Sequence, residues 1–157
     1  MSRRKAGAAR TVDYATLADL RYQIRRFLRV RETGVRAAGI EPQQYLLLLQ
    51  VKGLDGRRAA TIGALAERLQ IRHHSTVQLV DRLEARRLVV RRPHGDDRRV
   101  VLVEITAGGE ALLRRLALTS LAELQTAGPV LMGVLARLTN GGPRKSSSSP
   151  RRRGGSR

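Results

Sequence analysis

The apolar positions between residues 61 and 106 change their spacing along the chain, and this change predicts two short helices followed by a β-hairpin. Two sets of positions recur at intervals of three and four residues, the spacing of one helix face. The sets are Ile62, Leu65, Ala66 and Leu69, then Thr76, Leu79, Val80 and Leu83. Thr61 is suited to cap the first helix, because its hydroxyl can accept a backbone hydrogen bond. Only residues 70–72 remain for the bend, with Ile71 as its apolar plug, as in a helix-turn-helix.

After Arg87 the apolar period falls from about 3.6 to 2, which is typical of strands. Val101 and Val103 alternate with residues 102 and 104, and residues 88–90 give a matching short strand. The intervening PHGDDRR contains Pro, Gly and Asp, which favour a turn, and two arginines. Residues 55–106 are therefore predicted to form a winged helix, a unit that typically binds duplex DNA.

Two further helices are predicted before this unit. Residues 12–38 carry an apolar stripe and are expected to form one long amphipathic helix that stops at Gly39. Pro42 suits the start of the next helix, which is expected to reach about Lys52. This second helix is apolar nearly all round, so it is expected to lie at the centre of the core.

After the hairpin, the pattern predicts two more helices. Thr106 can cap the first of them, but Gly108 and Gly109 weaken its first turn, so that it would start a residue or two late. A Gly-Pro pair at 128–129 is expected to end this helix near residue 126 and to leave a short last helix over residues 130–138.

The flanking helices, residues 12–38 and 107–139, hold more leucine than a small winged helix can cover. Pairing with a second copy is the economical solution, since a two-fold homodimer presents two recognition helices to DNA. The expected fold is mainly α with a small β-hairpin wing and flanking dimerisation helices, in a single domain of residues 12–139.

Charge is concentrated at the two ends and on the predicted winged helix. The chain has a formal net charge of +18. Residues 1–11 are predicted to be a disordered basic arm, and residues 140–157 a disordered basic tail of low complexity. Within the body, residues 57–99 carry eleven Lys and Arg against five acids. Such a run is often only a solvated surface, but its coincidence with a winged helix favours a polyanion as partner.

Several classes of protein are disfavoured by the residues present. The chain has no cysteine, which excludes disulfides, thiolate zinc sites and thiol redox sensing. No apolar run is long enough to span a bilayer, so a cytoplasmic, nucleoid-associated protein without a membrane partner is expected. His73 and His74 would point about 100° apart on a helix and form no metal-ligand spacing with His94. No cofactor, metal site or enzymatic motif is predicted.

The chain resembles the MarR-type (multiple antibiotic resistance regulator) transcription factors. The matching segments are GIEPQQYLLLLQV, IGALAERL, STVQLVDRLEARRLV and DDRRVVLVEITAGGEALL. Asp97 and Arg99 occupy the D-x-R positions of the family's wing, ahead of the I-T-x-x-G formed by Ile105, Thr106 and Gly109. The resemblance implies an obligate dimer that binds a pseudo-palindromic operator, usually as a repressor, and is often released by a small ligand or a redox signal. That ligand would bind between the dimer helices and the DNA-binding part.

One position departs from the family's pattern. Relatives usually have glycine between the recognition helix and the first wing strand, where this chain has Arg87. Glycine suits that position because it accepts left-handed geometry, and another residue there costs on the order of 1 kcal/mol.

The second helix of the helix-turn-helix is predicted to enter the major groove, where its amino end and exposed side would contact the bases. Gln78 can bond adenine in bidentate fashion, and Val77 can touch a thymine methyl group. The alternative is an ordinary polar helix surface. The full set of predicted major-groove residues is His73, His74, Ser75, Val77, Gln78 and Arg82.

In the wing, Arg99 is predicted to insert into the minor groove, where a narrow groove concentrates negative potential. Asp97 would hold the Arg99 side chain in place, and Arg98 lies beside it. The alternative is a surface ion pair of little energetic value. The predicted phosphate contacts, which add affinity without sequence information, are Arg57, Arg58, Arg91 and Arg92.

Two functions remain open from the sequence. The first is a sequence-specific transcriptional regulator with double-stranded DNA, a second copy of the chain and a small effector of unknown identity as partners. The second is an architectural DNA-binding protein without operator or effector. Competition with excess random DNA separates them, since only a regulator keeps its footprint on one palindrome.

Overall fold

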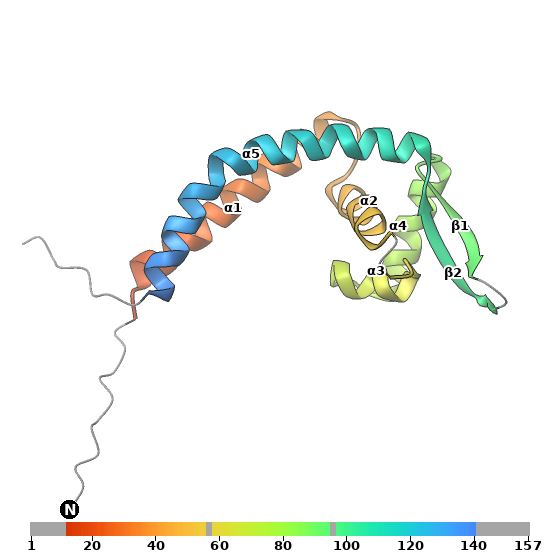
Figure 1. Cartoon of the computed structure of the whole chain (residues 1–157), viewed down its shortest axis with the longest axis horizontal. Helices are drawn as coiled ribbons and strands as arrows, with labels where there is room; N and C mark the ends of the chain where they lie inside the picture. Colours follow the sequence, from red (N-terminus) through yellow and green to blue (C-terminus); the bar gives the residue numbers. More distant parts are fainter. Residues whose placement is uncertain (1–11, 56–57, 95–96, 141–157) are drawn as a thin grey trace, which may run out of the picture.

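A computed structural model describes residues 12–55, 58–94 and 97–140, and shows a winged-helix lobe at one end of a long two-helix arm (Figure 1). The predicted basic arm (1–11), nearly all of the basic tail (141–157) and Arg57 lie outside the described residues. The elements are α1 (Tyr14–Ala37), α2 (Pro42–Leu54), α3 (Ile62–Leu69), α4 (His73–Ala85), β1 (Val89–His94), β2 (Asp97–Ile105) and α5 (Ala107–Thr139).

The helices begin where the sequence offers a capping group. The Thr61 hydroxyl accepts a hydrogen bond from the Ala64 amide at 3.2 Å, as predicted for the start of α3. Thr106 does the same for α5, accepting from the Gly109 amide at 3.0 Å. Helix α2 begins with Pro42 in its first turn and a capping box between Glu41 and residue 44.

The hydrophobic core lies in the lobe and is centred on α2. Leu47 and Leu48 of α2 are fully buried, as are Leu65, Val80 and Leu83 of the helix-turn-helix. The inward face predicted for α4 is confirmed, since Thr76, Leu79, Val80 and Leu83 are its buried residues. The buried hydroxyl of Thr76 is satisfied by the carbonyl of Arg72 at 3.2 Å.

The hairpin is antiparallel, with Val89 paired to Ile105 and Val90 to Glu104. Strand β1 continues to His94 and is therefore longer than the predicted residues 88–90. Pro93 is tolerated in β1, because β1 is an edge strand of a two-stranded sheet. Val89 and Val103 face the core, and a single bridge from Thr61 to Leu102 ties β2 to the start of α3.

One prediction is wrong: residues 107–139 form a single helix, α5, with no break at Gly128 and Pro129. A proline within a helix removes one backbone hydrogen bond and favours a bend rather than an obligatory stop. Figure 1 shows α5 as a curved helix with α1 beside it along its second half. Contacts with α1, including an ion pair of 3.0 Å between Asp19 and Arg137, extend beyond the proline. Packing of α5 against α1 therefore outweighs the helix-breaking tendency of Gly128 and Pro129.

The late start expected for this helix is also wrong, because α5 begins directly at Ala107. Gly109 is required there for packing. A Cβ atom built on it would lie 2.1 Å from the carbonyl oxygen of Leu88, at the base of the wing. Gly109 therefore marks a close contact between α5 and the hairpin.

A polar cluster connects the arm to the lobe. The buried Arg31 of α1 donates to Glu123 of α5 at 3.0 Å, and its guanidinium lies over the ring of Tyr45 of α2, 5.3 Å from the centroid. The Tyr45 hydroxyl and the Ser120 hydroxyl are 2.9 Å apart. A buried cation that is paired and placed over an aromatic ring holds three helices in a fixed relation. Among the described residues, no helix is long and apolar enough to cross a membrane.

Candidate nucleic-acid interface

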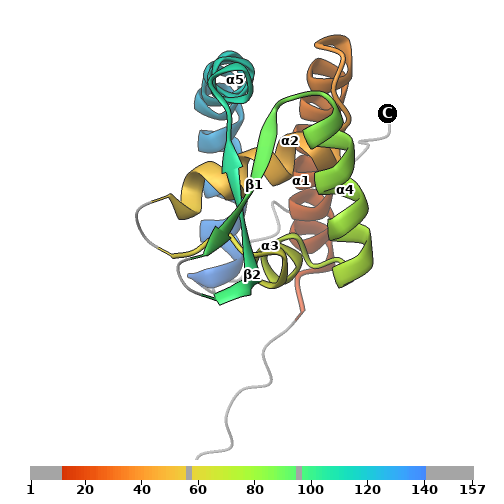
Figure 2. The ribbon, with the colours of Figure 1, turned by 90° about the vertical axis from the view of Figure 1, so that its right-hand side faces the viewer.

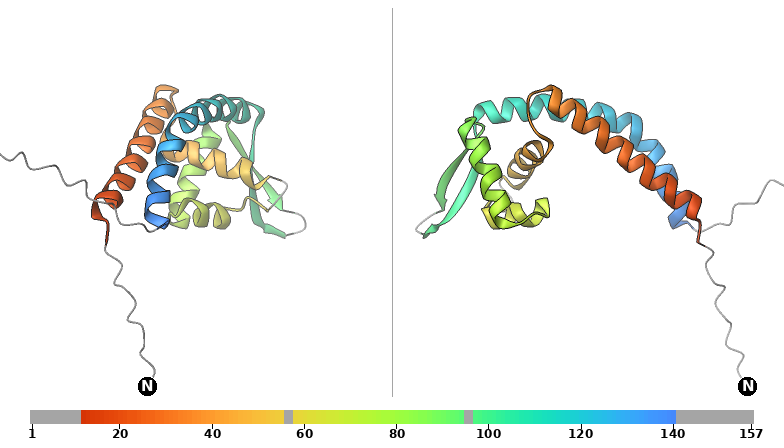
Figure 3. Two further views of the ribbon diagram at one scale, coloured as in Figure 1. Left: turned by 60° about the vertical axis from the view of Figure 1, so that its left-hand side comes forward. Right: turned by 180° about the vertical axis from the view of Figure 1, so that it is seen from behind.

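The amino end of α4 and the far end of the hairpin lie on the same side of the lobe (Figures 2 and 3). Helix α4 and the wing descend side by side from the start of α5, and α3 crosses near the amino end of α4. A duplex lying along this side would meet both elements at once. The predicted recognition helix and wing are thus brought together as a winged helix requires.

The predicted major-groove residues occupy the outer side of α4. His73, His74, Gln78 and Arg82 are exposed, whereas Ser75 and Val77 are partly buried. The Ser75 hydroxyl lies 3.4 Å from a ring nitrogen of His74. The first backbone amides of a helix carry partial positive charge and attract anions. Arg72, at the N-cap of α4, makes no side-chain capping bond and is exposed. Sequence reasoning treated Arg72 only as part of the bend and missed it as a cation at this end.

The wing is described less fully than the helix. Strand β2 begins at Asp97, but the side chains of Asp97, Arg98 and Arg99 lie outside the described residues, so their predicted roles remain predictions. Of the predicted phosphate contacts, Arg58 and Arg92 are exposed. Arg92 makes a long contact of 3.6 Å with Glu104 on the paired strand. Exposed pairs of this kind hold a side chain weakly.

Arg91 differs from these arginines because its guanidinium contacts two acids of α4. It donates to Asp81 at 2.5 Å and to Glu84, and its backbone amide donates to Glu84 at 3.1 Å. Partial burial acts to lower the pKa of Arg91, but the hydrogen bonds to Asp81 and Glu84 outweigh burial and raise the pKa above its ordinary value. Arg91 therefore stays protonated and linked to α4.

Arg87 adopts the left-handed geometry that the sequence analysis associated with this position. Its φ is 57°, and its carbonyl accepts a hydrogen bond of 2.7 Å from the Thr106 hydroxyl. The Leu88 carbonyl accepts another from the Thr106 amide at 3.1 Å. Thr106 thus joins the end of the recognition helix to the start of α5, and the chain turns into the wing here without a glycine.

Comparisons with known proteins identify this arrangement. A family model described as the MarR family matches residues 38–100, the segment that contains the helix-turn-helix and most of the hairpin. The fold is similar to that of AbsC, a MarR family transcriptional regulator from Streptomyces coelicolor, with a TM-score of 0.66 and 18% identity over 83% of this chain and 93% of that one. The chain has the winged-helix fold of the MarR-type proteins.

Two other MarR-type structures are similar over most of their length. A mutant MarR from E. coli gives a TM-score of 0.59 with 21% identity, covering 83% of this chain and 87% of that one. A mutant MepR from S. aureus bound to oligodeoxyribonucleotide gives a TM-score of 0.60 with 18% identity, covering 83% and 96%. No curated protein sequence matches this chain significantly. At these identities the structural likeness establishes the MarR-type fold of transcription regulators and leaves residue roles to the geometry.

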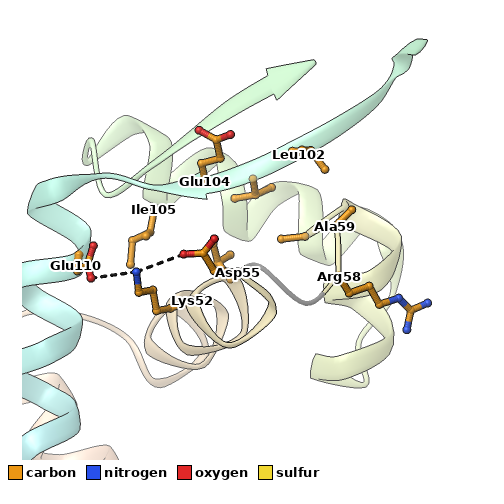
Figure 4. Close-up of a pocket in the computed structure, with 11 residues that line it drawn as sticks. Lys52, Asp55, Arg58, Ala59, Leu102, Glu104, Ile105 and Glu110 are labelled. Carbon is orange, nitrogen blue, oxygen red and sulfur yellow. Dashed lines mark hydrogen bonds and ion pairs between the residues drawn. The ribbon is translucent and has the colours of Figure 1, made fainter. Parts of the chain in front are cut away.

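A cavity of about 530 Å³ lies at the base of the MarR-type wing, between the end of α2, strand β2 and the start of α5. Figure 4 shows Lys52 between Asp55 and Glu110, with Ile105 of β2 beside them and Leu102 farther along the same strand, near Ala59. Lys52 is 3.0 Å from Glu110 and 3.4 Å from Asp55, and the hydrogen bond to Glu110, then that to Asp55, raises the pKa of Lys52. The ligand was expected between the dimer helices and the DNA-binding part, and this cavity lies between the start of α5, the end of α2 and the wing, without residues of α1 in its lining. Among the described residues, no group of three His, Cys, Asp or Glu is placed to hold a metal ion.

Proposed function

We propose that this MarR-type protein is a sequence-specific, double-stranded-DNA-binding transcriptional repressor that acts as a homodimer on a pseudo-palindromic operator. The observation that carries the proposal is the placement of the exposed face of α4 beside the wing, on one side of the lobe (Figure 2). A solved MepR of the same fold is bound to oligodeoxyribonucleotide, which supports a nucleic-acid partner for this surface.

The chemistry of the α4 surface suits base recognition. Gln78 and Arg82 are exposed one turn apart, so both side chains can reach into one groove. A glutamine amide can make two hydrogen bonds with adenine, and an arginine can make two with guanine. Arg99 in the wing is proposed for the minor groove, while Arg58 and Arg92, with Arg57, are proposed to contact phosphates.

The dimer part of the proposal rests on apolar side chains that the arm leaves exposed. On α5, Leu118, Leu121 and Met132 are 59%, 55% and 72% exposed. On α1, Leu17, Ile24 and Leu28 follow helical spacing and are 41–52% exposed. Large contiguous apolar surface is uncommon on a monomer, and a second copy of the same arm would cover it.

Release of DNA by a small ligand completes the proposal. The cavity at the base of the wing has a size that suits a small molecule, and six apolar and five charged residues line it. It contacts β2 and the start of α5, so an occupant would act on the elements that set the position of the wing.

Selection of bound genomic fragments, followed by footprinting with excess random duplex, tests the proposal. A regulator is expected to keep a protected palindrome under competition, and loss of the footprint would favour an architectural protein instead. On the selected duplex, Arg99→Ala is expected to weaken binding by at least about 1 kcal/mol, the scale of one specific contact. An Arg99→Ala protein that binds as tightly as the wild type would remove the wing from the mechanism. Gln43→Ala, at an exposed position on α2, provides a matched control.

A further inference from the structure

One residue of the wing, Arg91, contacts α4 at three positions between Val77 and Glu84. The Arg91 guanidinium contacts the Val77 carbonyl at 3.5 Å, the Asp81 carboxylate at 2.5 Å and the Glu84 carboxylate. These partners are spaced by four and three residues, so they lie on one face of α4 and span about 10 Å of the helix axis. The backbone amide of Arg91 also donates to Glu84, which fixes the strand as well as the side chain.

These contacts affect how α4 can approach DNA. Asp81 and Glu84 are the acids of α4, and each would be repelled by phosphates if it were not paired. Both also lie in the carboxyl-terminal half of the helix, where the helix dipole disfavours negative charge. The guanidinium of Arg91 satisfies both carboxylates together, a geometry that its planar fork of donors allows.

Arg92, the next residue of the same strand, has a different environment. Its side chain is 64% exposed, and its one ion pair with a described residue is the 3.6 Å contact with Glu104. The Arg91 side chain is 27% exposed and makes several charge-assisted hydrogen bonds. Adjacent residues of a strand point to opposite faces, so Arg91 faces α4 and Arg92 points away from it.

We propose that Arg91 is a positioning residue for DNA binding, which fixes the wing against the recognition helix and keeps Asp81 and Glu84 from opposing the duplex. It does not itself bind phosphate, in contrast to the role that the sequence suggested. A duplex is read in two grooves only if the helix and the wing keep a set separation, and Arg91 supplies the side-chain link that holds it. The inference rests on the proposed DNA-binding function.

The first experiment compares Arg91→Gln with Arg92→Gln on the duplex of highest affinity recovered from genomic selection. A lost phosphate contact lowers the slope of log affinity against log salt concentration by about 0.9 for each protomer. Arg92→Gln is expected to show this change. Arg91→Gln is expected to weaken binding about fivefold or more, on the scale of a partly exposed charge network, with the slope unchanged. A slope that falls for Arg91→Gln as it does for Arg92→Gln would overturn the proposal.

The second experiment measures the wing directly and needs no DNA. Because the chain has no cysteine, Pro93→Cys gives one spin-label position on the exposed part of β1. Removal of the link by Arg91→Gln or by Glu84→Gln is expected to increase label mobility, whereas Arg92→Gln is expected to leave it unchanged. Equal mobility in all of these proteins would contradict a positioning role.

A further variant separates the charge of Arg91 from its geometry. Arg91→Lys retains the charge but places it on a compact ammonium that cannot bridge two carboxylates in the same way. It is expected to resemble Arg91→Gln in label mobility, and full rescue would show that charge alone matters. If the wild type protects no duplex, the proposed function fails, while the mobility measurement still tests the link between wing and helix.

Discussion

In the described part of the chain, two residues other than glycine have positive φ angles. Each lies at the carboxyl end of one helix of the helix-turn-helix. Gln70, at 55°, closes α3, and Arg87, at 57°, follows α4. Side chains with a Cβ atom tolerate this geometry at a cost of roughly 1–2 kcal/mol. The chain accepts that cost at Arg87 because the hydrogen bonds from Thr106 to the Arg87 and Leu88 carbonyls hold the turn into the wing.

Replacement of Arg87 by glycine should therefore stabilise the fold. Arg87→Gly relieves the left-handed strain but increases the freedom of the unfolded chain, so the expected gain in the free energy of unfolding is about 0.5–1 kcal/mol. Urea unfolding at a fixed protein concentration measures it. Arg86→Gly is the matched control, because Arg86 has a φ of −88° and carries no such strain. An equal response at both positions would show that the geometry of Arg87 is not the cause.

At the scale of single residues, the sequence predicted most of what local geometry decides. The caps Thr61 and Thr106 and the inward face of α4 follow from spacing or residue type. The left-handed geometry at Arg87 was indicated only by the glycine that relatives have at this position. The pairing of Arg91 with Asp81 and Glu84 was not predicted. An arginine in a basic wing has the same sequence pattern whether it faces DNA or the helix behind it, and only the packing of β1 on α4 distinguishes the two.

At the scale of elements, the start of α5 lies directly against the base of the wing at Gly109. Gly108 and Gly109 have low helix propensity, yet α5 begins before both of them, at Ala107. Gly109 lies against the Leu88 carbonyl, whereas the nearest atom to a Cβ on Gly108 is 3.8 Å away. The same residue type is therefore required at one position and dispensable at the next.

Alanine substitutions at these two glycines should have opposite effects. Gly109→Ala places a methyl group against a backbone carbonyl that cannot move without shifting β1, and is expected to destabilise the fold by about 1–3 kcal/mol. Gly108→Ala meets no atom at close range and gains helix propensity, so an increase of about 0.5–1 kcal/mol is expected. Thermal unfolding of the two variants measures the difference. Equal changes in melting temperature would contradict the close approach seen between α5 and Leu88.

At the scale of the whole molecule, the arm of α1 and α5 carries more exposed apolar surface than the lobe needs for its own core. The buried residues of α5 include Leu113 and Leu116 near the lobe, and Val134 near the far end. Between these points leucines alternate with polar residues, and several of the leucines remain exposed. This distribution is expected of a helix whose second apolar face packs against another copy.

Disruption of that face should separate the proposed dimer. Leu121→Glu places a charge on the exposed apolar stripe of α5, and burial of an unpaired carboxylate is strongly unfavourable. Sedimentation analysis is expected to show monomers at concentrations at which the wild type is dimeric. Thr119→Glu introduces the same charge at an exposed polar position about 160° away around the helix, and is expected to leave the assembly intact. Dimers that persist in Leu121→Glu would assign the apolar stripe another role.

Caps and apolar periodicity act over a few residues, so the helix-turn-helix, the hairpin and the inward face of α4 could be predicted from the amino-acid sequence. It also located the basic surplus on the winged helix, since charge is a property of composition. Three features could not be predicted in this way: α5 continues through Pro129, Gly109 lies against Leu88, and Arg91 faces α4. Each of these depends on contacts between elements distant along the chain, whose packing energy exceeds the local preferences that a sequence pattern reports.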